Sequence, residues 1–254
     1  MIAALRYERV RLSTLRSTGW LIGLALGLNA IVVSLFAWFT RDDSFSDMLT
    51  GNGLTGFSAI SPLPFTALFM AIVGIFAAGH EYRYGTIHPV LTAVPRRGHL
   101  FTAKAITVTA IAAFTAVVSI VVNWVAMSAL RSEIVTVDPV LSDNGVAYVA
   151  LTVGWALLGL GLAFLLRGVP SAIVIIFVIP LVVEPLLLAL SNIPSLDWLA
   201  DAVPYLPFSA GQRMLGSDAT MNVDMSQWAS GAVFGAFVAL VLAAAWTLFQ
   251  RRDA

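Results

Sequence analysis

The chain has 254 residues, of which 59% are hydrophobic and only 11% are charged, and its mean hydropathy is +0.90. Ordinary soluble domains carry about 25% charged residues, so this composition is typical of an integral membrane protein. The formal net charge is zero, which leaves no basic surplus of the kind that nucleic-acid binding requires. The absence of cysteine excludes disulfides, thiolate metal sites and cysteine nucleophiles.

Six apolar runs along the chain are each long enough to cross a bilayer, which takes about 20 residues. The apolar part of a cleavable signal peptide has about 7–15 residues, so the first run is too long for one and is expected to stay as a span. We predict an all-α integral membrane protein, with a single transmembrane domain over residues 1–254 and spans near 19–39, 61–79, 102–130, 145–166, 170–190 and 227–249.

The positive charges alternate between the two sides of these spans and so predict their orientation. Of the 14 lysine and arginine residues, all except Arg41, Arg131 and Arg213 lie before span one, around the connections of spans two to three and four to five, or after span six. Segments rich in lysine and arginine stay in the cytoplasm. Both termini are therefore predicted to be cytoplasmic.

The segment 191–226, between spans five and six, is predicted to be an extracellular loop. Long connections inside compact proteins usually have a structure of their own. We therefore expect short interfacial or re-entrant helices there, with Trp198 and Tyr205 at the depth of the lipid headgroups.

A dense polar segment, residues 80–101, separates spans two and three. Gly85 permits a sharp backbone turn where span two ends, Thr86 can cap a new helix, and Pro95 can end it. We predict a short cytoplasmic helix of about two turns, from Ile87 to Val94, lying across the base of the two spans.

The charged residues around this helix have two interpretations. Arg96, Arg97 and Lys104 obey the positive-inside rule and can anchor to lipid phosphate. An acidic residue gains nothing from anionic lipid, so lipid anchoring leaves Glu81 unexplained. Glu81, close to Arg83 in the sequence, is expected either to pair within the chain or to face a protein partner.

A longer pattern runs through the same segment and consists of Glu81, Gly85-Thr86, Leu91, Pro95, Arg97 and Lys104. It resembles the signature loop of ABC transporter permeases of the type-2, or exporter, class. In that family the segment holds a coupling helix that docks into a separate ATP-binding subunit, and the His88-Pro89 pair departs from the family's pattern. The resemblance assigns coupling to the ATPase to Glu81, Arg83, Gly85, Thr86, Ile87, Leu91, Pro95, Arg96, Arg97 and Lys104.

The resemblance implies a permease subunit of an ATP-driven exporter in the bacterial plasma membrane, working as a homodimer or with a similar permease chain. ATP and Mg²⁺ are expected on the ATP-binding partner, because the chain contains no Gly-x-x-x-x-Gly-Lys-Ser/Thr phosphate loop. The N-terminal segment 1–18 also resembles the family's interface helix; because its leucines share a face with arginines, a basic membrane anchor is an equal alternative. No catalytic, cofactor or metal site is predicted, since the spacing of His80, His88 and His99 matches no short helical metal motif.

Two polar residues within the spans, Glu184 and Asn123, are candidates for the translocation path. A charge in a span costs several kcal/mol unless it is paired or reaches water. Glu184 is therefore either a substrate or proton site or a structural residue that satisfies backbone groups freed by nearby prolines. Asn123 is expected to hydrogen-bond to a neighbouring helix. The stripe of Gly19, Gly23 and Gly27 can pack against a helix of the same chain, which is the favoured alternative, or of another chain.

A rival function from another class is a self-contained membrane protein, such as a secondary carrier or a scaffold. A carrier typically shows several intramembrane acids and an inverted repeat, whereas this chain has Glu184 and no convincing internal duplication. A scaffold would not need the coupling pattern.

Overall fold

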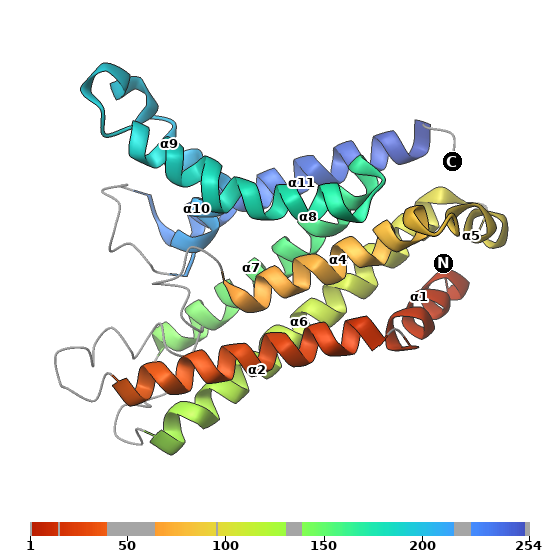
Figure 1. Ribbon diagram of the computed structural model, residues 1–254, viewed down its shortest axis with the longest axis horizontal. Coiled ribbons are helices and arrows are strands. Elements are labelled where there is room, and N and C mark those ends of the chain that lie inside the picture. Colours follow the sequence, from red (N-terminus) through yellow and green to blue (C-terminus); the bar gives the residue numbers. More distant parts are fainter. Residues whose placement is uncertain are drawn as a thin grey trace.

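The protein is a bundle of long helices in a computed structural model that describes residues 2–14, 16–39, 64–94, 96–130, 139–215 and 225–251 (Figure 1). Within those residues, six helical segments are long and apolar enough to cross a membrane. This confirms the predicted all-α fold with six candidate spans. The helices that carry them are α2 (Arg16–Phe39), α4 (Phe65–Arg83), α6 (Arg97–Leu130), α7 (Pro139–Leu166), the run of α8, η2 and α9 (Val169–Leu190), and α11 (Gln227–Arg251).

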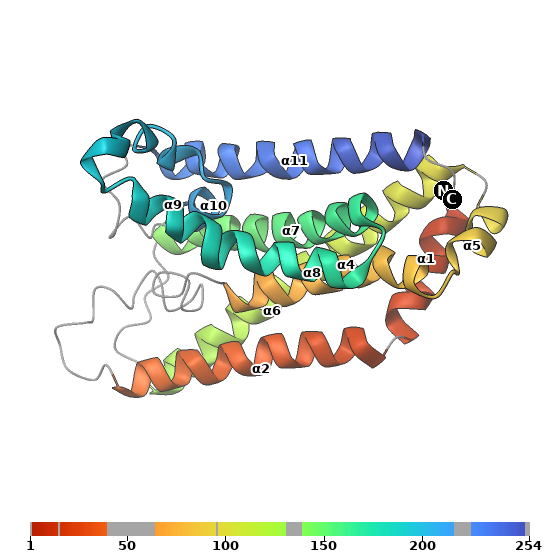
Figure 2. The same ribbon diagram turned by 45° about the horizontal axis from the view of Figure 1, so that its top comes forward.

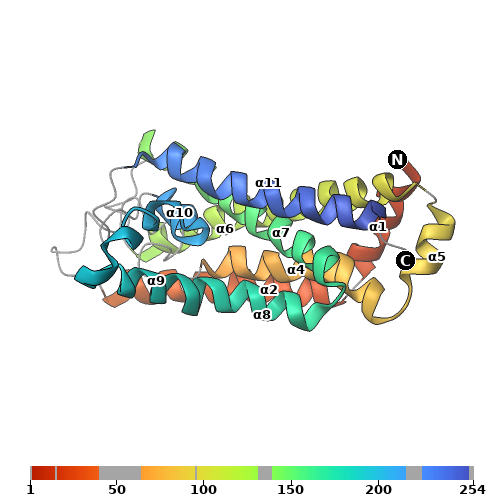
Figure 3. The same cartoon turned by 90° about the horizontal axis from the view of Figure 1, so that it is seen from above.

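Short helices lie at the two ends of the bundle (Figures 2 and 3). One end holds α1 (Ile2–Thr14) and α5 (Ile87–Ala93), close to the C-terminal end of α11. The opposite end holds α10 (Pro207–Arg213). We call these the α1–α5 end and the α10 end.

The centre of the bundle is the contact between α4 and α7, the two most buried spans. Two glycines allow their backbones to touch. A Cβ atom on Gly74 would lie 2.0 Å from the backbone oxygen of Ala156, and one on Gly159 would lie 2.1 Å from that of Ala71. Small residues at such crossings are how helices pack tightly without a hydrophobic driving force between them.

The glycine stripe of α2 does not pack in this way. A Cβ atom added to Gly19, Gly23 or Gly27 meets nothing within 4 Å in the described part of the chain. The favoured alternative, packing within the chain, is therefore wrong for the described residues. The stripe lies on the exposed side of a span whose inner side faces α6 and α4.

The fifth span is a broken helix. It begins as α8 (Val169–Val178), passes through a π-helical turn, η2 (Ile179–Val183), and continues as α9 (Glu184–Leu190). The backbone N–H of Glu184 donates to the carbonyl of Ile179, five residues back. Prolines at 180 and 185 each remove a backbone donor, which shifts the hydrogen-bond register and favours such a turn.

Short helices do form in the segment 191–226, as predicted, in the part that the structure describes. They are the 3₁₀ helices η3 (Pro194–Leu199) and η4 (Val203–Tyr205), followed by α10. Helix α10 inserts between α7 and α11: the Phe208 ring lies 4.9 Å from that of Trp155, centroid to centroid, and a Cβ on Gly211 would touch Leu151 and Phe234. Trp198 and Tyr205 are exposed, and their depth in the headgroup layer stays a prediction.

Candidate functional site

Helix α5 begins with a backbone turn that the sequence predicted correctly. Gly85 has a φ of 66°, in the left-handed region that favours glycine. The N–H of Tyr84 donates to the His80 carbonyl at 2.9 Å and closes the end of α4. Thr86 occupies the N-cap position as predicted, but its hydroxyl makes no capping hydrogen bond. The helix ends at Ala93, and the predicted terminator Pro95 lies outside the described residues.

Helix α5 has an inner and an outer face. Ile87 and Val90 are buried in the core cluster of the bundle, and Leu91 packs against the same cluster. His88 and Thr92 are exposed on the other face, where the Thr92 hydroxyl donates to the His88 carbonyl at 3.0 Å. The helix is thus held to the spans by apolar contacts and presents a small, largely uncharged outer face.

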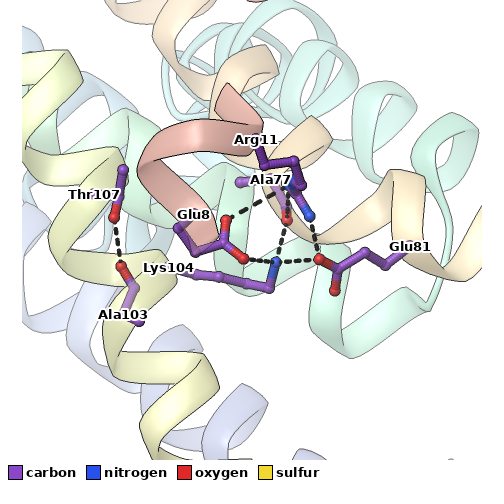
Figure 4. A network of polar contacts seen from close by, with 7 residues as sticks. All are labelled: Glu8, Arg11, Ala77, Glu81, Ala103, Lys104 and Thr107. Carbon is purple, nitrogen blue, oxygen red and sulfur yellow. Dashed lines mark hydrogen bonds and ion pairs between the residues drawn. The ribbon is translucent and has the colours of Figure 1, made fainter. Parts of the chain in front are cut away.

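Four charged side chains of α1, α4 and α6 meet inside the α1–α5 end (Figure 4). Lys104 of α6 is fully buried, and its Nζ donates to Oε1 of Glu81 in α4 at 2.6 Å and to Oε1 of Glu8 in α1 at 2.7 Å. It also donates to the Ala77 carbonyl at 2.8 Å. Glu8 is 0% exposed and Glu81 is 2% exposed. We call Glu8, Arg11, Glu81 and Lys104 the ion cluster.

Arg11 of α1 completes the ion cluster. Its guanidinium donates to Oε1 of Glu81 and, at 2.5 Å, to the Ala77 carbonyl, and it lies 3.7 Å from Oε2 of Glu8. Two carboxylates therefore face two cations across three helices. This balance matters because removing one partner from a buried ion pair leaves an uncompensated charge at a cost of about 3–5 kcal/mol.

The outer flank of α1 is open beside the ion cluster. A hollow of about 480 Å³ there is lined by Arg6, Tyr7, Val10 and Arg11. Partial burial raises the pKa of the Tyr7 phenol above its usual value, and the nearby Glu81 carboxylate adds to this. The arginine side of the ion cluster is thus the side nearest to solvent, with the Arg11 side chain 15% exposed.

The structure separates the two interpretations of the charged residues. Glu81 pairs within the chain. Lys104 was expected to anchor to lipid phosphate or to belong to the coupling pattern; lipid anchoring is wrong, because Lys104 is enclosed by protein. Arg97 donates to the Phe249 carbonyl at 3.0 Å, so it secures the last turn of α11, where a cation also matches the helix dipole. Arg83 and Arg96 are exposed.

Sequence reasoning missed Glu8 and Arg11. Segment 1–18 was interpreted from its leucines and arginines alone, but Glu8 is its only acidic residue and is spaced i, i+3 from Arg11. That spacing places both side chains on one face of a helix. The available signal for these two residues was a single acidic residue among arginines, on a helix that precedes the first span.

Asn123 belongs to a second polar network, deep between the spans. The Asn29 side chain in α2 donates to Ser119 Oγ at 2.8 Å and to Asn123 Oδ1 at 2.7 Å, both in α6. Ser119 also lies within hydrogen-bond distance of Thr66 in α4 and Tyr148 in α7. The expected interhelical hydrogen bond of Asn123 is confirmed, and this candidate for the translocation path is fully buried.

Glu184 has a structural role. Its Oε1 accepts from the N–H of Phe208 at 2.8 Å, and its Oε2 accepts from the N–H and hydroxyl of Ser209 at 2.7 and 2.6 Å. The carboxylate therefore satisfies the N-terminal donors of α10 and ties this helix to the fifth span. Its hydrogen bonds therefore come from α10, and not from backbone groups freed by the prolines of its own span. Arg213 of α10, also buried, donates to the Pro204 carbonyl.

The fold and the ion cluster define the class: a multi-span helical membrane protein with a buried charge network at one end. In the part of the chain that the structure describes, no three His, Cys, Asp or Glu side chains gather into a set that could hold a metal ion. A comparison with models of known protein families finds no match for this chain, and neither does a comparison with proteins of curated function.

Proposed function

We propose that this chain is the membrane-spanning permease subunit of an ATP-driven ABC exporter of a bacterial plasma membrane. It would form the translocation path as a homodimer or with a similar permease chain, and couple to a separate subunit that binds ATP and Mg²⁺. The observation that carries the proposal is the position of α5. This short helix connects α4 and α6 and lies at the end of the bundle, where Glu81 and Lys104 join the same two spans.

This position suits α5 for transmitting force. A push on its outer face passes through Ile87 and Val90 into the core, because both side chains are buried there. The ion pair of Glu81 and Lys104 holds the adjoining ends of α4 and α6 together, so both spans would move with α5. Packed interfaces transmit such displacements because they are close-packed and resist compression.

Side chains in and around α5 then fall into two groups, which include the exposed His88 and Thr92 beside residues of the coupling pattern. His88, Thr92, Arg83 and Arg96 are exposed and are the side chains that would meet the ATP-binding subunit. Glu81, Ile87 and Lys104 are buried and would act as positioning residues without touching it. In the proposed function, the first group contacts the ATP-binding subunit and the second group transmits force to the spans.

The proposal predicts an ATPase reading frame adjacent to the gene for this chain, and it is tested by co-purification with the subunit which that frame encodes. Thr92→Arg places a large cation on the outer face of α5 and is expected to reduce both association and the ATPase activity measured in lipid nanodiscs. Ser195→Arg, at an exposed hydroxyl residue of the α10 end, is the matched control and should leave both unchanged. Equal association of the two variants with the ATPase would contradict the proposal.

A further inference from the structure

The ion cluster divides into two pairs that are each neutral. Glu8 and Arg11 both belong to α1, 3.7 Å apart with i, i+3 spacing. Glu81 and Lys104 both belong to the span bundle, 2.6 Å apart across α4 and α6. The ion pairs that join α1 to the bundle are the crossed pairs, Lys104 with Glu8 and Arg11 with Glu81.

We propose that the ion cluster is a releasable latch, in which α1 undocks from the spans by exchanging crossed ion pairs for pairs within each half. Separation leaves Glu8 with Arg11 on α1 and Glu81 with Lys104 on the bundle. Neither half then carries an unpaired charge. An unpaired buried charge is what makes breaking a buried ion pair so costly. The inference does not require the transport function proposed above.

The hydrogen bonds of the docked state support an exchange. Each carboxylate uses one oxygen: Oε1 of Glu8 and Oε1 of Glu81 accept all of the hydrogen bonds, whereas both Oε2 atoms are buried and accept none from the described residues. Oε2 of Glu8 lies 3.7 Å from Arg11 Nη2. A small movement of the guanidinium therefore converts this contact into a hydrogen-bonded pair on α1.

The bundle half stays assembled when α1 leaves. Lys104 keeps its bonds to Glu81 and to the Ala77 carbonyl, both of which belong to α4. The adjoining ends of α4 and α6, and with them α5, would thus remain one body while α1 moves. The hollow along Arg6, Tyr7, Val10 and Arg11 brings solvent to the arginine side of the latch, where release would begin.

Four double variants test the latch, and each removes one acid and one base so that the net charge is constant. Glu8→Gln with Arg11→Gln, and Glu81→Gln with Lys104→Met, each delete one half and leave no crossed pair. Glu8→Gln with Lys104→Met, and Arg11→Gln with Glu81→Gln, each leave one crossed pair. In the two variants that keep a crossed pair, undocking leaves one unpaired charge on α1 and one on the bundle. In the two variants that lack a half, undocking leaves no unpaired charge.

The readout is the distance between spin labels on α1 and α6 in nanodiscs. The chain has no native cysteine, so labels at Val10→Cys and Ile106→Cys, which are 55% and 50% exposed, report without background. We expect wild type and the crossed-pair doubles to give one narrow distribution. The half-deleted doubles should raise the ratio of undocked to docked α1 by on the order of tenfold or more. The same distribution in all four doubles, docked or released, would overturn the latch.

Thermal unfolding gives a second test that needs no label. Lys104→Met alone leaves two buried carboxylates facing one guanidinium, whereas adding Glu81→Gln restores neutrality. The double variant is therefore expected to unfold at a higher temperature than the single variant. A lower midpoint for the double variant would also overturn the division into two neutral halves.

Discussion

At the α1–α5 end, the carboxylates of Glu8 and Glu81 face charged donors from other helices, whereas at the α10 end the carboxylate of Glu184 faces uncharged donors of a helix N-terminus. Both arrangements attach a short helix to the spans through a buried acid. Charged pairs can be exchanged for other charged pairs, but Glu184 has no cation in hydrogen-bond contact among the described residues. The attachment of α1 through the ion cluster is therefore suited to release, and the attachment of α10 through Glu184 is suited to staying in place.

Lys104→Met is expected to have the largest effect on stability. Methionine has a similar length but leaves the two carboxylates of the ion cluster facing one cation, and loss of one partner from a buried pair costs about 3–5 kcal/mol. Thermal unfolding in nanodiscs measures the change. Lys104→Arg, which keeps the charge, is the control, and a wild-type midpoint for the methionine variant would contradict the charge balance drawn for this end.

Glu184→Gln is expected to have a smaller and more local effect. The amide keeps one acceptor but turns an NH₂ group toward the donors of α10, and a hydrogen bond to a charged group contributes about 1.5–3 kcal/mol. Hydrogen exchange should accelerate in residues 207–213 while α1 stays protected. Ser209→Ala, which removes only the hydroxyl donor, should accelerate it less. Faster exchange in α1 instead would break the comparison between the two ends.

Arg97→Met is expected to loosen the end of α11 alone. The variant loses one hydrogen bond to the Phe249 carbonyl, whereas Glu184 accepts three, and a bond that involves a charged group contributes about 1.5–3 kcal/mol. Hydrogen exchange of the last turn of α11 is the measurement. Unchanged exchange there would show that the aromatic packing of Phe249 against Phe164 and Phe101 is sufficient by itself.

Arg83→Ala is expected to have the smallest effect on stability. Arg83 is exposed and lies 5.7 Å from the centroid of the Tyr84 ring, outside the ion cluster. Its thermal midpoint should match that of wild type, because exposed side chains away from special features contribute little. A loss comparable to that of Lys104→Met would mean that exposed and buried charges at this end act as one network.

The spans and helix α5 were predictable because their signals are local. About 20 consecutive apolar residues define a span, and Gly85 marks the turn into α5 with a backbone conformation that favours glycine. The π-helical turn of the fifth span was not predicted, although prolines at 180 and 185 in one apolar run were a visible sign. Local patterns therefore account for most of the helices and their order.

The partners of the charged residues were not predictable from the same signals. Lys104 meets Glu8 across 96 residues of sequence, and Glu184 meets Phe208 across 24. Hydropathy reports how apolar a neighbourhood is along the chain, so a lysine near the start of a span is interpreted as an interfacial anchor. Only the packing of α1 against α4 and α6 shows that Lys104 is enclosed.

The proposed function depends on contact between α5 and an ATP-binding subunit, and cysteine crosslinking measures that contact directly. In a chain without native cysteine, Thr92→Cys on the outer face of α5 is expected to crosslink to the ATP-binding subunit through a short bifunctional reagent. Ser195→Cys, exposed at the α10 end, should not. Crosslinking of neither position, or of both equally, would contradict the account.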